Sequence, residues 1–235
     1  MRNFVWIFRH YLQKNFLTPA NLLIIALPLT FIFAFNLLDI GVLYGIAIPL
    51  VLGSQFFGAD LTANWLHHDM KGSTRSRLLV SPVAPHVFHM AVMTAGCLFN
   101  VLYGSIVVAF TAIAFGVEWG NYGLVLVVLL ALSFITQMVG VLIFRFTKDE
   151  KSSSRISYVF AEVMMLVVAL PIVINNVADL SATFANILNH LPVSAGMNII
   201  ANDNLLYNMA VLLGMVAAMT AVAFLVGRGQ EEIKK

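Results

Sequence analysis

Charged side chains are scarce in this chain: they make up 10% of its 235 residues, whereas hydrophobic residues make up 60%. A soluble domain carries about 25% charged residues. The single cysteine, Cys97, lies inside an apolar run, so no disulfide can form within the chain. The net charge is only +2, and the basic residues are scattered, which argues against a nucleic-acid partner. These shortages predict an integral membrane protein.

Sequence motifs for ATP and for catalytic metals are also missing. No lysine lies in the Gly-x-x-x-x-Gly-Lys-Ser/Thr pattern that cradles phosphates, and no His-Glu-x-x-His occurs. Two histidine groups have spacings that metals can use, His67-His68-Asp69 and the i, i+3 pair His86 and His89. Neither has a Cys or Glu beside it in sequence. We therefore expect no metal site, no cofactor in this chain and no enzyme activity.

Long apolar runs predict an all-α membrane domain with six spanning helices, since about 20 residues cross the hydrocarbon. We place the spans at residues 20–38, 41–60, 86–115, 121–144, 156–175 and 205–227. Two connections are longer than turns, residues 61–85 and 176–204. The six spans, their connections and the first 17 residues together form one domain over 1–235.

The distribution of Lys and Arg predicts the orientation, because these residues are retained on the cytoplasmic side of span ends. With six spans, every Lys and Arg falls on one side, and both termini become cytoplasmic. The alternate connections hold acids but no Lys or Arg. The basic residues are Arg2, Arg9, Lys14, Lys71, Arg75, Arg77, Arg145, Lys148, Lys151, Arg155, Arg228, Lys234 and Lys235.

Two segments outside the spans carry further signals. Residues 1–17 have an amphipathic helical pattern, which predicts a helix lying on the membrane lipids. Residues 176–204 are external in this topology and too apolar for a solvated loop. Such a segment is compatible with two short helices that dip back into the outer leaflet, joined by a turn at 189–192.

The predicted cytoplasmic connection contains the most specific motif, within residues 65–83. It runs from a Gly-Ser-Thr step at Thr74 through charged residues to Leu78-Leu79 and then Pro82-Val83. This stretch resembles the first cytoplasmic loop of ABC-2 type transporter permeases. Gly72 stands one place early, and Arg75-Ser76 replace an apolar-acidic pair that is usual there. The interfacial helix, six spans and apolar external segment resemble the same family over the whole length.

The resemblance implies an ABC-2 (type V exporter-like) fold in a bacterial or archaeal cytoplasmic membrane. It implies a coupling helix that docks on a separate ABC ATPase subunit, which binds ATP and Mg. It also implies a dimer with a second copy or a homologous permease. The alternative is an interfacial loop that touches only lipid headgroups. The expected coupling residues are three apolar anchors and three rim residues: Trp65, Leu66, Met70, His68, Asp69 and Lys71.

In the family, spans 2 and 5 face the translocation path. The expected path residues here are Gln55, Phe56, Glu162, Met165 and Ala169. Glu162 is the only acid well inside a predicted span, so it either contacts substrate or protons, or bonds between helices, for example to Tyr158. We expect Asn100 and Gln137 to hydrogen-bond between helices.

The function implied is export of a hydrophobic or amphipathic substrate: a drug, a lipid-like molecule or an antimicrobial peptide. The alternative is an ion-coupled secondary carrier or a membrane enzyme with no ATPase partner. A proton-coupled carrier is expected to hold more intramembrane acids than Glu162, and an enzyme needs a catalytic pair facing one cavity.

Overall fold

A computed structural model describes residues 2–18, 21, 26, 28–34, 43–70, 84–174 and 190–232. Most residues in these ranges are helical, and none of them lies in a strand. The all-α prediction is therefore confirmed for the described part. Of the predicted spans, 20–38 lies largely outside the described residues, as does most of the motif segment, 71–83.

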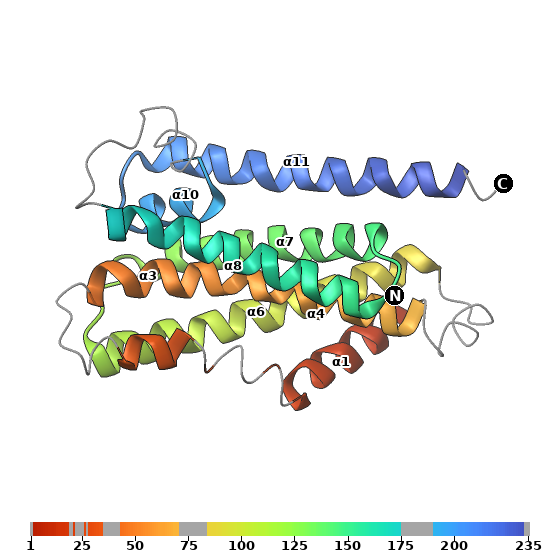
Figure 1. Cartoon of the computed structure of the whole chain (residues 1–235), viewed down its shortest axis with the longest axis horizontal. Coiled ribbons are helices and arrows are strands. Elements are labelled where there is room, and N and C mark those ends of the chain that lie inside the picture. Colours follow the sequence, from red (N-terminus) through yellow and green to blue (C-terminus); the bar gives the residue numbers. More distant parts are fainter. Residues whose placement is uncertain are drawn as a thin grey trace.

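The helices form an elongated bundle (Figure 1). Helices α3, α4, α6, α7 and α8 run along its length, α1 lies across one end, and α10 lies at the other. Helix α11 runs along an outer edge, where it contacts α7 and α10. The elements are α1 (Arg2–Leu17), α3 (Leu43–Ser54), the 3₁₀ turn η1 (Gln55–Phe57), α4 (Gly58–Met70), α6 (Pro85–Phe115), α7 (Tyr122–Phe146), α8 (Glu150–Ile174), α10 (Pro192–Ile200) and α11 (Leu205–Glu232).

Three helical segments are long and apolar enough to cross a membrane: His86–Phe115, Tyr122–Phe146 and Leu205–Ala223. They match the predicted spans 86–115, 121–144 and 205–227. The predicted spans 41–60 and 156–175 are helical over their described residues, in α3 to α4 and in α8. These features are those of a membrane protein, while the count of six spans stays a prediction.

Local sequence signals account for several helix ends. Gly116 ends α6 in the left-handed conformation, with φ 65°, where glycine carries no steric penalty. Asn121 caps α7, because its side-chain oxygen accepts a hydrogen bond of 2.9 Å from the Gly123 amide. Proline occupies the first turn of α6 and of α10, at Pro85 and Pro192, where no intrahelical donor is needed.

Helix α1 occupies the predicted interfacial segment, but much of it packs on protein. Tyr11 is buried, and its ring meets the Phe88 ring of α6 edge to face at 5.7 Å. Trp6 and Leu17 remain 71% and 80% exposed. One face of this amphipathic helix thus packs on α6, and the other face contacts the surroundings.

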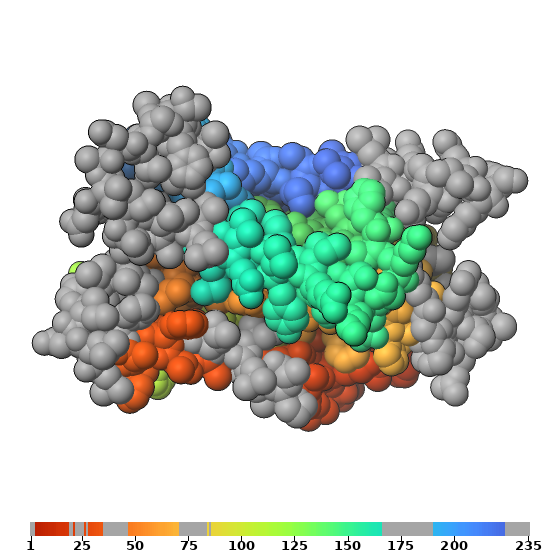
Figure 2. Space-filling model, viewed as in Figure 1, coloured from red at the N-terminus to blue at the C-terminus, as the bar shows by residue number. Residues whose placement is uncertain are grey.

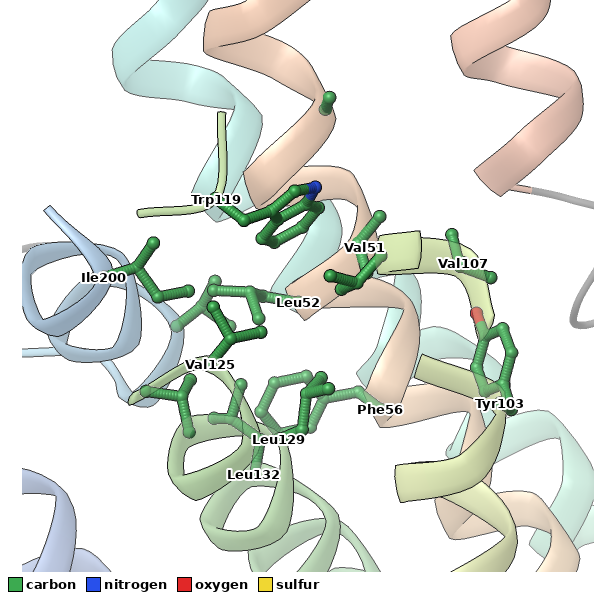
Figure 3. Close-up of a cluster of buried hydrophobic side chains, with 14 of the residues drawn as sticks. Val51, Leu52, Phe56, Tyr103, Val107, Trp119, Val125, Leu129, Leu132 and Ile200 are labelled. Atoms are coloured by element: carbon green, nitrogen blue, oxygen red, sulfur yellow. The ribbon is translucent and has the colours of Figure 1, made fainter. Parts of the chain in front are cut away.

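The hydrophobic core lies where α3, η1, α6, α7 and α10 converge (Figure 3). Trp119, from the segment between α6 and α7, closes one end of it, and its indole Nε1 donates to Thr111 Oγ1 at 3.0 Å. The fully buried aliphatic and aromatic side chains include Val51, Leu52, Phe56, Leu129 and Leu132. This packing fixes η1 and the start of α4 between α6 and α7.

Candidate functional site

The helical run from Leu43 to Met70 is interrupted at η1, in its middle. A 3₁₀ turn inside a helix changes the hydrogen-bond ladder, and carbonyls released in an apolar environment need other donors. Asn100 Nδ2 of α6 donates to the Gln55 carbonyl at 3.1 Å, and Gln137 Nε2 of α7 donates to the Gly58 carbonyl at 3.4 Å. Asn100 and Gln137 thus bond between helices, as predicted, and they bond to this break.

More polar side chains gather around the break. Ser133 Oγ of α7 donates to Gln55 Oε1 at 3.2 Å, and Thr62 of α4 donates to Gln137 Oε1. Ser54 Oγ and Tyr103 Oη lie 2.6 Å apart. All these side chains are buried. The break is therefore enclosed by amides and hydroxyls from α6 and α7.

Glycines make room for these amides. An added Cβ on Gly58 would lie 2.0 Å from Asn100 Nδ2, and one on Gly96 would lie 2.4 Å from Gln137 Oε1. On Gly140 it would lie 2.6 Å from the Ala59 carbonyl oxygen. Small residues let helices approach closely in membranes. Here they also admit the side chains that bond to the break.

Asp60, one turn beyond the break, is a buried acid that the sequence analysis missed. It is 7% exposed, on the side of α4 that packs against α8. The Ser154 and Asn64 side chains lie within reach of its carboxyl group, and Ser154 Oγ donates to Asn64 Oδ1 at 3.1 Å. Asp60 was overlooked because the predicted span ended at residue 60, whereas the helix continues to Met70.

The predicted path residues within the described part differ in their exposure. Gln55 and Phe56 are fully buried within the chain, and the Phe56 ring meets the Phe160 ring at 5.6 Å. Met165 is half-buried, with Cγ 3.2 Å from where a Cβ on Gly53 would lie. Glu162 is exposed on the surface of α8, a helix that lies at the front of the molecule in Figure 2. The Ala169 side chain lies outside the described part.

The predicted coupling residues up to residue 70 lie on α4. Leu66 is fully buried, so within this chain it is a core residue and not an exposed anchor. Trp65 is half-buried and tied to α1: its Nε1 donates to Asn15 Oδ1 at 2.8 Å, and Lys14 Nζ lies 3.7 Å from its ring centroid. Burial lowers the pKa of Lys14, and the nearby Glu150 carboxylate opposes that shift.

The rest of the α4 terminus is polar. His67 is buried, with Nε2 2.7 Å from Thr147 Oγ1, and this contact ties α4 to the end of α7. His68 Nδ1 lies 2.7 Å from Asp69 Oδ1, and the His68 side chain is 47% exposed. Met70 is half-buried. Lys71 lies outside the described residues.

No protein-family model matches the chain, and no curated protein is detectably similar to it.

Two kinds of chemistry lie along α4. The amides and hydroxyls at the break can only exchange hydrogen bonds. The enclosed carboxyl group of Asp60 can hold a proton or a cation, since an ionisable group between membrane helices is a candidate for either. The α4 terminus, with His68 at its surface, offers a polar edge to a partner.

Proposed function

We propose that the chain is the permease subunit of an ATP-driven exporter of the ABC-2 type, acting in a bacterial or archaeal cytoplasmic membrane. A separate ABC ATPase subunit supplies ATP hydrolysis, and two permease halves, identical or homologous, form the path. The supporting sequence features are the one-sided Lys and Arg residues and the motif from Thr74 to Pro82. The three apolar helices are consistent with this placement.

The observation that carries the proposal is the fixed attachment of α4. The motif segment follows directly after α4, which continues the second predicted span as one helical run. Trp65 is held by Asn15 of α1, and His67 by Thr147 of α7. A displacement of the motif segment by an ATPase would therefore be transmitted through α4 to α1, to α7 and to the break at η1.

A substrate that enters from the membrane fits this chain best. The external connection of 176–204 is too short for a domain that grips a bulky extracellular partner. Exposed apolar side chains lie along α6, α8 and α11, as expected of surfaces that contact lipid or lipid-like molecules. We propose a drug, a lipid-like molecule or an antimicrobial peptide as the exported class.

The test is co-purification with an ATPase. The chain is expressed with any ABC ATPase encoded beside its gene, solubilised gently and isolated through a tag on the permease. We expect the ATPase to co-purify with wild type, and His68→Glu and Met70→Glu to reduce its yield severalfold. Glu118→Ala, an exposed substitution at the far end of α6, is the control. Equal ATPase yield from all variants would show that α4 is not the coupling element.

One observation favours a second candidate, an ion-coupled secondary carrier. That class is expected to enclose acids between its helices, and Asp60 is such an acid. Uptake or efflux by vesicles that hold the purified chain alone, driven by an ion gradient without ATP, would favour the carrier over the exporter.

A further inference from the structure

Asp60 faces one particular turn of α8. Helices α4 and α8 run side by side (Figure 1), and two contacts fix their register. Asn64 meets Ser154 through a hydrogen bond, and the Phe57 ring lies 6.1 Å from the Tyr158 ring. Asp60 lies between Asn64 of α4 and Phe57 of η1, so the stretch of α8 from Ser154 to Tyr158 lies opposite it, with Ser153 directly before that stretch. Ser157 is the polar buried residue in that interval.

Like Thr136 of α7, two serines on one face of α8 differ from most hydroxyls in the described helices. Thr94, Ser105 and Thr220 each donate to the carbonyl four residues earlier, at 2.7 Å, which is the usual solution in a helix. Ser153 and Ser157 are fully buried and occupy the same face, four residues apart, yet within the described part of the chain neither hydroxyl has a hydrogen-bond partner.

One oxygen of the carboxyl group opposite them also lacks a partner, whereas the Ser154 and Asn64 side chains bond to that carboxyl group. Asp60 Oδ1 is buried and makes no hydrogen bond with any described residue. The same part of the chain contains no salt bridge to Asp60. Glu150, at the start of α8, is close enough to add negative potential, although Lys14 lies near Glu150 in turn. A buried carboxylate is costly unless it is neutralised.

We propose that the seam between α4 and α8 is a binding site for a monovalent cation of the Na⁺ type. Asp60 Oδ1 supplies the charge, and the hydroxyl oxygens of Ser153 and Ser157 supply neutral ligands. Hard cations bind oxygen, and a single carboxylate matches a single positive charge, whereas calcium sites gather several carboxylates. A proton on Asp60 would supply a single donor, whereas a cation can contact all three oxygens at once. The inference depends only on this seam and not on the exporter proposal.

The experiment measures thermal stability of the purified full-length chain in detergent at fixed pH. NaCl replaces choline chloride at constant ionic strength. We expect Na⁺ to raise the Tm by about 3 °C or more once it exceeds its dissociation constant tenfold. The response should vanish in Asp60→Asn and in the double variant Ser153→Ala/Ser157→Ala, which keeps the carboxyl group. Glu118→Gln and Ser105→Ala are matched controls, and both should respond like wild type.

Two results would overturn the site. One is an equal Tm of wild type in NaCl and in choline chloride. If the Tm then changes only with pH, Asp60 is a proton site and not a cation site. The other is a full Na⁺ response in the double serine variant. Because wild type alone decides the first point, poor folding of Asp60→Asn does not remove the test. The measurement uses no ATPase, so its outcome is separate from that of the proposed export function.

Discussion

At the scale of single residues, close approach between backbone and polar side chains sets what the bundle tolerates. Gly140 lies against the α4 backbone, where an added methyl group would meet the Ala59 carbonyl oxygen. Backbone cannot move aside as a flexible side chain can. Gly214 in α11 has nothing within 4 Å of the same position. Alanine substitutions at these two glycines therefore distinguish the cost of a packing clash from the gain in helix propensity.

We expect Gly140→Ala to destabilise the protein by about 1–3 kcal/mol, the usual cost of overpacking. Gly214→Ala should be neutral or slightly stabilising, because alanine is the better helix former. Thermal unfolding in one detergent, followed for both variants, measures the difference. Equal Tm values would mean that α7 does not approach α4 as closely as described.

The amide of Gln137 is expected to matter more than its apolar bulk. Gln137→Leu keeps the volume but removes the donor to the Gly58 carbonyl and the acceptor for Thr62. Leaving buried partners unsatisfied costs about 1–3 kcal/mol. Unfolding measurements on Gln137→Leu and on Gln137→Leu/Thr62→Val should show that the second substitution costs little further. A large additional loss would mean that the two side chains act independently.

The sequence predicted the role of a residue only where its side chain has few possible hydrogen-bond partners. Asn100 and Gln137 lie within apolar helices and have to find partners, so their interhelical bonds were predictable. Glu162 lies equally deep in a predicted span, yet it is exposed on α8, because hydropathy does not reveal which face of a helix is covered. Asp60, at the end of another predicted span, is buried instead. Its position depends on where a helix ends, which is the least predictable feature of a sequence.

At the scale of elements, α4 is more than the start of a loop. The residues from 61 to 70 were predicted as part of a cytoplasmic connection. They continue the helix and are mostly buried, and α4 packs against α6, α7 and α8. The interruption at η1 had no clear sequence signal, because Pro49 lies inside α3 without ending it. The break depends on donors from α6 and α7, which are remote in sequence.

Helix α1 packs chiefly on α6, and Trp65 of α4 should add a second attachment. Trp65→Ala removes the bond to Asn15 and the contact with Lys14, together worth about 1–2 kcal/mol. We expect hydrogen exchange of the α1 amides to accelerate about tenfold. Trp6→Ala is the control, since Trp6 is largely exposed.

An unchanged exchange rate in Trp65→Ala would show that α1 is retained by its contacts with α6 alone, such as that between Tyr11 and Phe88.

At the scale of the whole molecule, the order and spacing of the helices were the most predictable features. The segments predicted at 86–115, 121–144 and 205–227 reappear as α6, α7 and α11, because their apolar runs are long and bounded by polar residues. Orientation across the membrane comes from the Lys and Arg distribution, so it needs its own test.

We predict that a cysteine at Lys148 reacts with an impermeant thiol reagent only after the cells are opened, whereas a cysteine at Glu118 reacts in intact cells. Both positions are exposed, and Cys97 is first replaced by alanine. Ser153 lies in the same predicted cytoplasmic segment but is fully buried, so it would be a poor reporter. Labelling at Lys148 from outside intact cells would contradict the six-span topology.

The break at η1 also has a consequence for the order of events during biosynthesis. Gly58 leaves the ribosome 79 residues before Gln137, the residue that donates to its carbonyl. At about 5–20 residues per second, translation takes about 4–16 s to cover that distance. Helix α6 is completed only late in this interval and α7 is still incomplete at its end, so an uninterrupted helix is the favoured form of the nascent second predicted span. The 3₁₀ turn then forms only when α7 arrives, as a late step of membrane assembly.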